Sequence, residues 1–204
     1  MPANVQPRAL ELNDLDVAPS GATVVLADFV ARTTLADIPT EAQALLRGCF
    51  LDFVGNSAFA SAHAESSLAI RTAIRQLDGK DGPATVIGEA SGYSWQMAAL
   101  LNGAYAHSLD FDDTNQIQTG HPGVPVIAAA LAEAELMSAT LASFLEALAV
   151  GYEVCCRVGG AIGQAVMTAG FSSRASAAFS GPSPQSQSSA RWIESRSQTP
   201  SGLR

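Results

Sequence analysis

The stretch from Ser94 to Glu135 decides the fold, and it reads "SWQMAALLNGAYAHSLDFDDTNQIQTGHPGVPVIAAALAEAE". It opens and closes with alanine- and leucine-rich segments of the kind that form closely packed helices. Between them, from His107 to Gly123, lie two of the chain's three histidines and a run of aspartates. We therefore predict two helices joined by a polar corner, which is a catalytic site, a metal site or a solvated turn.

The segments on both sides of this stretch also carry the apolar spacing of helices. Further helices are predicted from Ala22 to near Pro39, from an N-cap at Thr40 onward, and over Glu65–Leu77 and Leu141–Gly163. The helices flanking the corner begin at a capping Ser94 and extend over Val124–Met137. The one extended piece is Ala84–Gly88. The fold class is therefore mainly α, a helical bundle-like domain.

Composition divides the chain into three parts. Residues 1–20 contain no apolar run and are expected to form a flexible tail. Residues 21–171 carry the helical pattern and are expected to form one domain. Residues 172–204 are about one-third serine, with three prolines and no helical or strand period, so we expect a disordered tail there.

Charge excludes two classes of partner. The formal net charge is −8 and the chain has a single lysine, Lys80, so we expect no nucleic-acid partner. The longest apolar stretch, Leu141–Gly163, contains Glu146, Glu153 and Arg157, which argues for a buried helix rather than a membrane span. We expect no membrane partner.

The three cysteines indicate a reducing environment. Cys155 and Cys156 are neighbours and the third, Cys49, stands alone, so no disulfide framework is predicted. All three are expected to be core thiols. The sequence therefore predicts a cytoplasmic protein.

The polar corner places acids and a histidine on one helical face if the first helix continues through Asp113. His107, Asp110 and Thr114 then lie at i, i+3 and i+7. Asp113 lies beside them, and Asp112 is expected to point elsewhere. This face alone offers an acid–base pair and a hydroxyl group.

The second histidine, His121, is expected to fold back toward the same end. Pro122 and Gly123 then begin the next helix, whose free N–H groups favour a carboxylate or phosphate. A histidine is a suitable proton shuttle near neutral pH, and a neighbouring aspartate can fix its tautomer. The combination suits proton abstraction next to a carboxylate, followed by loss of a β-substituent.

Metal binding and a solvated helix end are the alternatives. Carboxylates suit Mg²⁺ or Ca²⁺, but a calcium loop requires glycine at its sixth position and glutamate at its end, where Asn115 and His121 stand. Zinc would favour more histidine or cysteine at helical spacing. We predict no metal, and a metal-dependent hydrolase using the aspartates remains an alternative.

The motif "HSLDFDDT" followed by "HPGVPVIAAALAEAE", together with "LDFVGNSAFASA" and "FLEALAVGYEVCCRVGGAIG", resembles the MmgE/PrpD family. The family includes 2-methylcitrate dehydratase, an enzyme of propionate catabolism, and cis-aconitate decarboxylase. The resemblance implies an all-helical domain and lyase chemistry on di- or tricarboxylates without any cofactor. It implies that Asp110, Thr114 and His121 line the active site. We therefore predict that His121 and Asp110 are catalytic, and that Thr114, Asp113 and His107 bind substrate.

The resemblance ends near Phe171, where family members continue with a second histidine and substrate-binding lysines. Here no histidine follows His121 and no lysine follows Lys80. Arg71 and Arg157 are the alternative cations, although no spacing places them at His121. We expect a product truncated or frameshifted after Phe171, and a homodimer if it folds. The alternative function is an inactive remnant or a helical interaction module.

Overall fold

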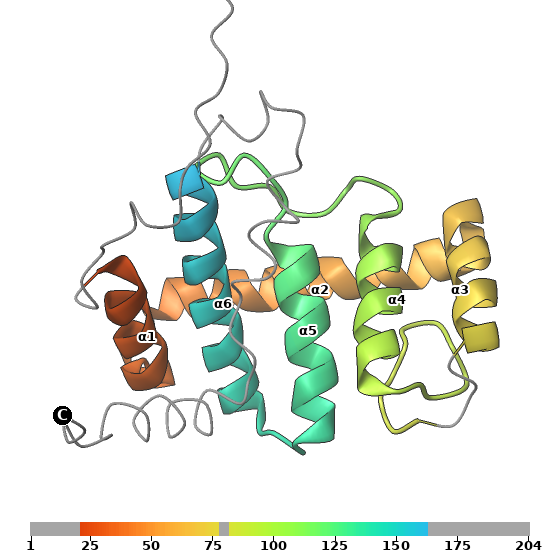
Figure 1. The fold of residues 1–204 in the computed structure, drawn as a ribbon, viewed down its shortest axis with the longest axis horizontal. Coiled ribbons are helices and arrows are strands. Elements are labelled where there is room, and N and C mark those ends of the chain that lie inside the picture. Colours follow the sequence, from red (N-terminus) through yellow and green to blue (C-terminus); the bar gives the residue numbers. More distant parts are fainter. Residues whose placement is uncertain (1–20, 78–81, 163–204) are drawn as a thin grey trace, which may run out of the picture.

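The computed structural model describes residues 21–77 and 82–162, which form a helical domain (Figure 1). The prediction of a mainly α fold is confirmed. A single 3-10 turn and six α-helices make up the described part: η2 (Leu35–Asp37), α1 (Ala22–Arg32), α2 (Thr40–His63), α3 (Glu65–Leu77), α4 (Trp95–His107), α5 (Gly123–Leu136) and α6 (Leu141–Ile162).

Three helices stand side by side and a fourth crosses behind them. In Figure 1, α4, α5 and α6 are upright neighbours, while the long α2 runs across their backs. α1 lies at one end of α2 and α3 at the other. Because α4, α5 and α6 alternate in direction, the loop from α4 to α5 lies at the same end of the domain as the end of α6.

Two apolar clusters hold this arrangement together. The larger joins α2, α5 and α6, and its fully buried members include Ile127, Leu148 and Cys155. The smaller joins α3 and α4 to the segment before α4, and includes Tyr93 and Tyr105. Burial of such side chains stabilises by about 1.5–3 kcal/mol each, so these clusters fix the helices that flank the polar corner.

The first predicted helix is shorter than its pattern indicated. α1 ends at Arg32 rather than near Pro39. Thr34 and Asp37 instead form a reciprocal capping box that opens η2. The predicted N-cap at Thr40 is wrong by one residue, because Pro39 takes that position and Thr40 is the first helical residue. Local side-chain capping therefore competes with continuation of the helix.

The remaining element predictions agree closely with the structure. α3 spans the predicted residues, α4 has Ser94 as its N-cap, and α5 and α6 begin within one residue of the prediction. The extended piece forms one isolated bridge, Ala84 with Tyr93. Asn102 on α4 fixes it by accepting from the Ile87 N–H at 2.8 Å and donating to the Thr85 carbonyl at 2.9 Å.

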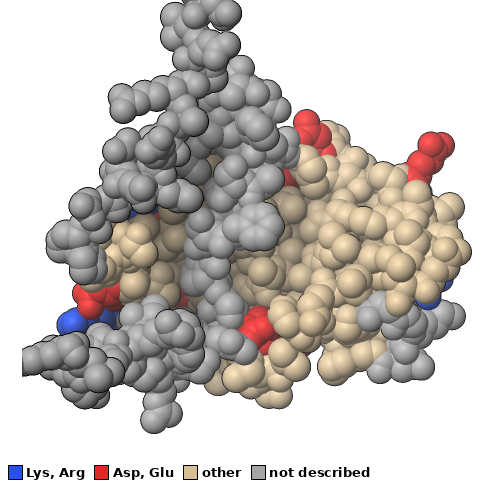
Figure 2. Space-filling view, in the orientation of Figure 1, with Lys and Arg blue, Asp and Glu red and all other residues tan. Residues whose placement is uncertain are grey.

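One face of the described part of the chain can be inspected for charge. Figure 2 shows that the described residues on this face are mostly uncharged and that their few charged side chains are scattered. Among residues 21–77 and 82–162, no helix has both the length and the apolar character needed to cross a membrane. The predicted tails, 1–20 and 172–204, and the end of the predicted 21–171 domain lie outside the described residues.

Candidate active site

The polar corner begins where α4 ends, at His107. Asp110 takes the left-handed conformation, with φ of 55°, and so cannot continue the helix. Aspartate tolerates this conformation better than most residues. The predicted helical face through Thr114 is therefore wrong, and with it the expectation that Asp112 points elsewhere, because the turn directs Asp112 inward.

A small hairpin returns the chain to this corner. Asn115 and Gly120 pair through both backbone groups, at 2.8 and 3.3 Å. The Asn115 side-chain oxygen accepts from the N–H groups of Ile117 and Gln118, at 2.9 and 3.0 Å. Thr119 completes the turn with φ of 57°. The next residue after the hairpin is His121, so the predicted fold-back of this histidine is confirmed.

The tip of the hairpin is anchored on α6. Gln118 is fully buried, and its side-chain oxygen accepts weak hydrogen bonds from the thiols of Cys155 and Cys156, at 3.6 and 3.7 Å. A Cβ at position 159 would overlap the Gln118 side chain. Gly159 therefore allows this loop residue to approach α6 closely.

The centre of the corner is the carboxylate of Asp112, whose side chain is 4% exposed. His107 Nδ1 lies 3.0 and 3.1 Å from its two oxygens. His121 Nδ1 lies 3.1 Å from Oδ2 of the same carboxylate and 3.3 Å from the Asp112 backbone oxygen. The two imidazole rings meet edge to face, with centroids 5.3 Å apart. One buried acid therefore contacts both histidines of the motif.

The predicted catalytic pair is brought together at the surface of this cluster. Asp110 Oδ1 lies 3.7 Å from Nε2 of His121 and 3.9 Å from Nδ1 of His107. The Asp110 side chain is 75% exposed, whereas that of His121 is 16% exposed. Nε2 of His121 thus faces an open carboxylate. Thr114 is exposed on the following loop.

Asp113 turns away from the imidazoles toward the start of α5. Its Oδ1 accepts a hydrogen bond from the Gly123 N–H at 2.9 Å. The N–H group predicted to bind a carboxylate or phosphate is therefore bound by the chain's own carboxylate. Burial raises the pKa of Asp113 above its ordinary value, while the hydrogen bond from the Gly123 N–H acts in the opposite direction. Its role in substrate binding stays a prediction.

Four side chains of the corner also have the spacing of a metal site. His107, Asp110, Asp112 and His121 offer atoms that all lie within 4.8 Å of one another. Pairing of both Nδ1 atoms with Asp112 accounts for most of this closeness. The absence of a metal stays a prediction, and divalent ions that raised the melting temperature strongly would revive the alternative hydrolase.

The two alternative cations are paired away from the corner. Arg71 binds Glu89 at 2.6 Å. Arg157 pairs with Glu153 one turn earlier on α6. Neither guanidinium has a recorded contact with His121 among the described residues. Among the described residues, both guanidinium groups are therefore paired with glutamates rather than with the polar corner.

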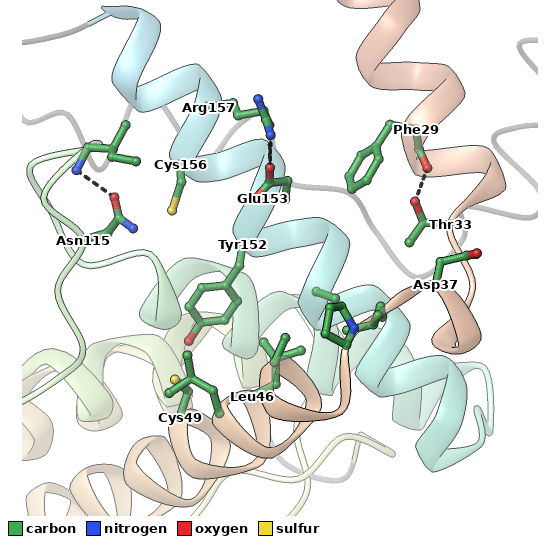
Figure 3. Close-up of a pocket in the computed structure, with 16 residues that line it drawn as sticks. Phe29, Thr33, Asp37, Leu46, Cys49, Asn115, Tyr152, Glu153, Cys156 and Arg157 are labelled. Carbon is green, nitrogen blue, oxygen red and sulfur yellow. Dashed lines mark hydrogen bonds and ion pairs between the residues drawn. The ribbon is translucent and has the colours of Figure 1, made fainter.

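A cavity of about 600 Å³ lies beside the corner, between α1, α2, α6 and the hairpin. Figure 3 shows Tyr152 reaching across it toward Cys49, with the Arg157–Glu153 pair at its side. The sequence did not predict this cavity, because its walls come from four separate segments. Most of its lining is apolar.

The cysteines are the free thiols that the sequence predicted. Burial raises the pKa of Cys49 and of Cys155, and it raises that of Cys156 to about 11. A thiol with a raised pKa carries little thiolate near neutral pH and is a poor nucleophile. The cysteines are therefore packing groups.

The fold and the corner define an all-α domain that presents a histidine–carboxylate cluster between two antiparallel helices. Residues 24–181 match the model of the MmgE/PrpD N-terminal domain, which extends past the predicted end of the resemblance at Phe171. The chain belongs to the MmgE/PrpD family. It is also 30% identical over 155 residues to the cis-aconitate decarboxylase-like protein oryM of Aspergillus oryzae, covering 72% of this chain and 32% of oryM. The match thus spans about a third of that relative's length.

Proposed function

We propose that this chain carries one wall of a cofactor-independent lyase site for a small di- or tricarboxylate. His121 is the proton shuttle and Asp110 is its partner acid. Thr114, Asp113 and His107 contribute to substrate binding. The reaction is dehydration of a 2-methylcitrate-like substrate, a step of propionate catabolism, or decarboxylation of a cis-aconitate-like one.

The observation that carries the proposal is the orientation of His121. Its Nδ1 faces Asp112, while Nε2 faces the exposed carboxylate of Asp110 at 3.7 Å. A base in this position can take a proton from a carbon next to a substrate carboxylate. In a dehydration the C–H electron pair forms the double bond, and the β-hydroxyl group leaves with a proton as water.

Family membership and the similarity to a cis-aconitate decarboxylase-like protein support the same class of reaction. Substrate binding by this chain is expected to be weak, with Kd of about 1 mM, because Arg71 and Arg157 are engaged elsewhere. Turnover is expected to be slow for the same reason.

The test combines binding with turnover. Histidine-labelled protein is titrated with citrate while the imidazole signals are followed by NMR. We expect His107 and His121 to shift together, whereas His63, exposed at the end of α2, stays unchanged. A lyase assay on 2-methylcitrate, citrate and cis-aconitate uses His121→Ala as its control. Equal shifts at all three histidines, or turnover that survives His121→Ala, would contradict the proposal.

We also propose that the chain forms a cytoplasmic homodimer. The outer surface of α2 exposes Leu45, Leu51 and Phe59, at 68%, 72% and 55%. Exposed apolar patches commonly mark contacts between subunits. Light scattering is expected to give twice the 21.0 kDa mass of the chain. A charged residue in place of Leu51 is expected to reduce the measured mass to that of a single chain. The free cysteines support the reducing compartment.

A further inference from the structure

The buried carboxylate of Asp112 has no role in the proposed reaction, yet it contacts both histidines of the corner. It is 4% exposed and takes the Nδ1 side of each ring. Asp110, by contrast, is 75% exposed and lies on the Nε2 side of His121. The two acids therefore approach the His121 ring from opposite edges, one from the interior and one from the open surface.

The surroundings of Nδ1 determine where the proton of each imidazole lies. For His121, the nearest groups to Nδ1 are the Asp112 carboxylate at 3.1 Å and the Asp112 backbone oxygen at 3.3 Å. Both are acceptors only, because a backbone carbonyl and an ionised carboxylate carry no proton. Nδ1 must therefore carry a hydrogen, and in the neutral ring Nε2 is left with its lone pair.

The same reasoning applies to His107. Its Nδ1 lies 3.0 and 3.1 Å from the two oxygens of the Asp112 carboxylate, which again requires a hydrogen on Nδ1. A carboxylate has about four lone-pair sites, so one acid can serve both rings. Its burial strengthens the hydrogen bond with His107 and the electrostatic contact with His121, because water competes little for the carboxylate.

We propose that Asp112 is a positioning residue: it fixes the Nδ1–H tautomer of both imidazoles and aims Nε2 of His121 at the open side of the corner. This inference rests on the proposed function for its catalytic meaning, since a proton shuttle needs its lone pair toward the substrate. Asp112 touches neither the substrate nor the reacting atoms. It determines which nitrogen of His121 is the base.

The geometry distinguishes this role from those of the neighbouring acids. Asp113 accepts from the Gly123 N–H rather than from an imidazole. Asp110 faces Nε2 of His121, where a partner for the transferred proton belongs. Three acids within four residues thus make three different contacts: Asp110 faces Nε2 of His121, Asp112 faces both Nδ1 atoms, and Asp113 binds the first N–H of α5.

The direct test is nitrogen NMR on the full chain with ¹⁵N-labelled histidine, without any ligand. The chain has three histidines, so single substitutions assign each signal. Spectra are recorded at rising pH until they stop changing, when all rings are neutral. We expect His107 and His121 to be Nδ1–H tautomers, whereas the exposed His63 gives a solution-like mixture. A wild-type His121 that is predominantly Nε2–H would overturn the proposal without any variant.

The variants test cause. In Asp112→Ala, His121 keeps only the backbone oxygen of residue 112 as acceptor, so its Nε2–H fraction is expected to rise severalfold. Asp112→Asn is expected to change at least one ring, because the amide N–H₂ group donates where the carboxylate accepted. Asp113→Ala is the matched control and is expected to leave both tautomers unchanged. An unchanged His121 spectrum in Asp112→Ala, with the fold intact by circular dichroism, would overturn the proposal.

Activity separates failure of this inference from failure of the proposed function. Where turnover is measurable, Asp112→Asn is expected to lower kcat by about 100-fold or more while KM changes less than about threefold. Loss of the tautomer preference with kcat unchanged overturns the positioning role. If the tautomers are as expected but neither citrate binding nor turnover is found, the positioning role of Asp112 stands and the lyase proposal is refuted.

Discussion

Two carboxylates in this domain are almost equally buried, but one contacts guanidinium groups and the other contacts imidazoles. Glu89, before α4, has a side chain that is 3% exposed, and Asp112, after α4, has one that is 4% exposed. An isolated buried charge is costly, so each acid must be compensated. The compensation is made from different chemistry at the two ends of the helix.

Glu89 is compensated by permanent charge. It binds the guanidinium groups of Arg71 and Arg75, each at 2.6 Å, and accepts from the hydroxyl of Tyr105 at 3.2 Å. The hydrogen bond from Arg71 to Glu89 is the main cause that raises the pKa of that arginine above its ordinary value. Arginine stays protonated across the physiological range, so this cluster holds α3 against α4 and cannot exchange protons.

Asp112 instead contacts two imidazoles, whose ring nitrogens can each donate or accept a hydrogen bond. The Asp112 cluster reaches solvent through the carboxylate of Asp110, whereas the Glu89 cluster reaches it through the guanidinium of Arg75. The chemistry of the partner rather than the burial of the acid therefore separates a structural cluster from a candidate catalytic one. The following predictions test that distinction.

The largest effect is expected from removing the charge of Glu89. Glu89→Gln leaves two guanidiniums without their carboxylate, which should lower the free energy of unfolding by about 2–4 kcal/mol, less than for a fully buried pair because Arg75 is partly exposed. Urea denaturation measures the loss. Glu65→Gln, at an exposed position on α3, is the matched control and should change it by less than about 0.5 kcal/mol. Equal losses of unfolding free energy in the two variants would contradict a structural role of Glu89.

The next effect concerns Gly123, which joins the corner to α5. A Cβ there would overlap Asp113 Oδ1 and lie 2.6 Å from the Tyr152 hydroxyl. Gly123→Ala is expected to lower the free energy of unfolding by about 1–3 kcal/mol, by displacing Asp113 from the helix start. Gly55→Ala is the control, because a Cβ on that α2 glycine meets open space. Gly55→Ala should stabilise the folded chain by about 0.5–1 kcal/mol. A loss of stability in this variant would contradict the helical conformation of α2 at this position.

Local signals in the sequence predict most of the helices and the short loop of the polar corner. The boundaries of α3 and the start of α4 follow from apolar spacing and capping, which are local signals. The closeness of Asp110 and His121 also followed, because both residues belong to one short motif. Periodicity and turn chemistry act within a few residues, so they predict elements and short loops.

The inward turn of Asp112 could not be predicted in this way. One residue in the left-handed conformation, Asp110, changes the direction of every side chain after it. The sequence offered a continuing helix as an equally good local solution. The Glu89 cluster was also missed, because its partners Arg71 and Tyr105 come from two separate helices. Pairing across the fold has no local signal.

A smaller effect on stability is expected at Asp112, despite its burial. Asp112→Asn keeps the shape of the side chain and one oxygen that can accept a hydrogen bond from an imidazole N–H. We expect a loss of about 1 kcal/mol in the free energy of unfolding, well below that of Glu89→Gln. The two variants are compared in one urea series at neutral pH. A loss at Asp112 as large as that at Glu89 would mean that both clusters serve the fold in the same way.

The smallest effect is a pH dependence that separates Asp113 from both clusters. Burial raises the pKa of Asp113 above its ordinary value of 3.8. Its charged form is therefore disfavoured in the folded chain, and stability present below pH 3.8 is lost as pH rises through the raised value. Asp113→Asn removes this loss. The free energy of unfolding of the variant should therefore rise relative to that of the wild type as the pH increases above 3.8.

Asp37 provides the control of opposite sign. The hydroxyl of Thr34 donates to its carboxylate at 2.7 Å and the Thr34 N–H at 2.9 Å, and these bonds lower the pKa of Asp37 below 3.8. Its contribution is present above pH 3.8 and is lost as pH falls through the lowered value. As the pH rises, the free energy of unfolding of Asp37→Asn should therefore fall relative to the wild type. That of Asp113→Asn should rise relative to the wild type. Parallel curves for the two variants would show that burial does not govern Asp113, and that the start of α5 holds its carboxylate as favourably as the capping box holds Asp37.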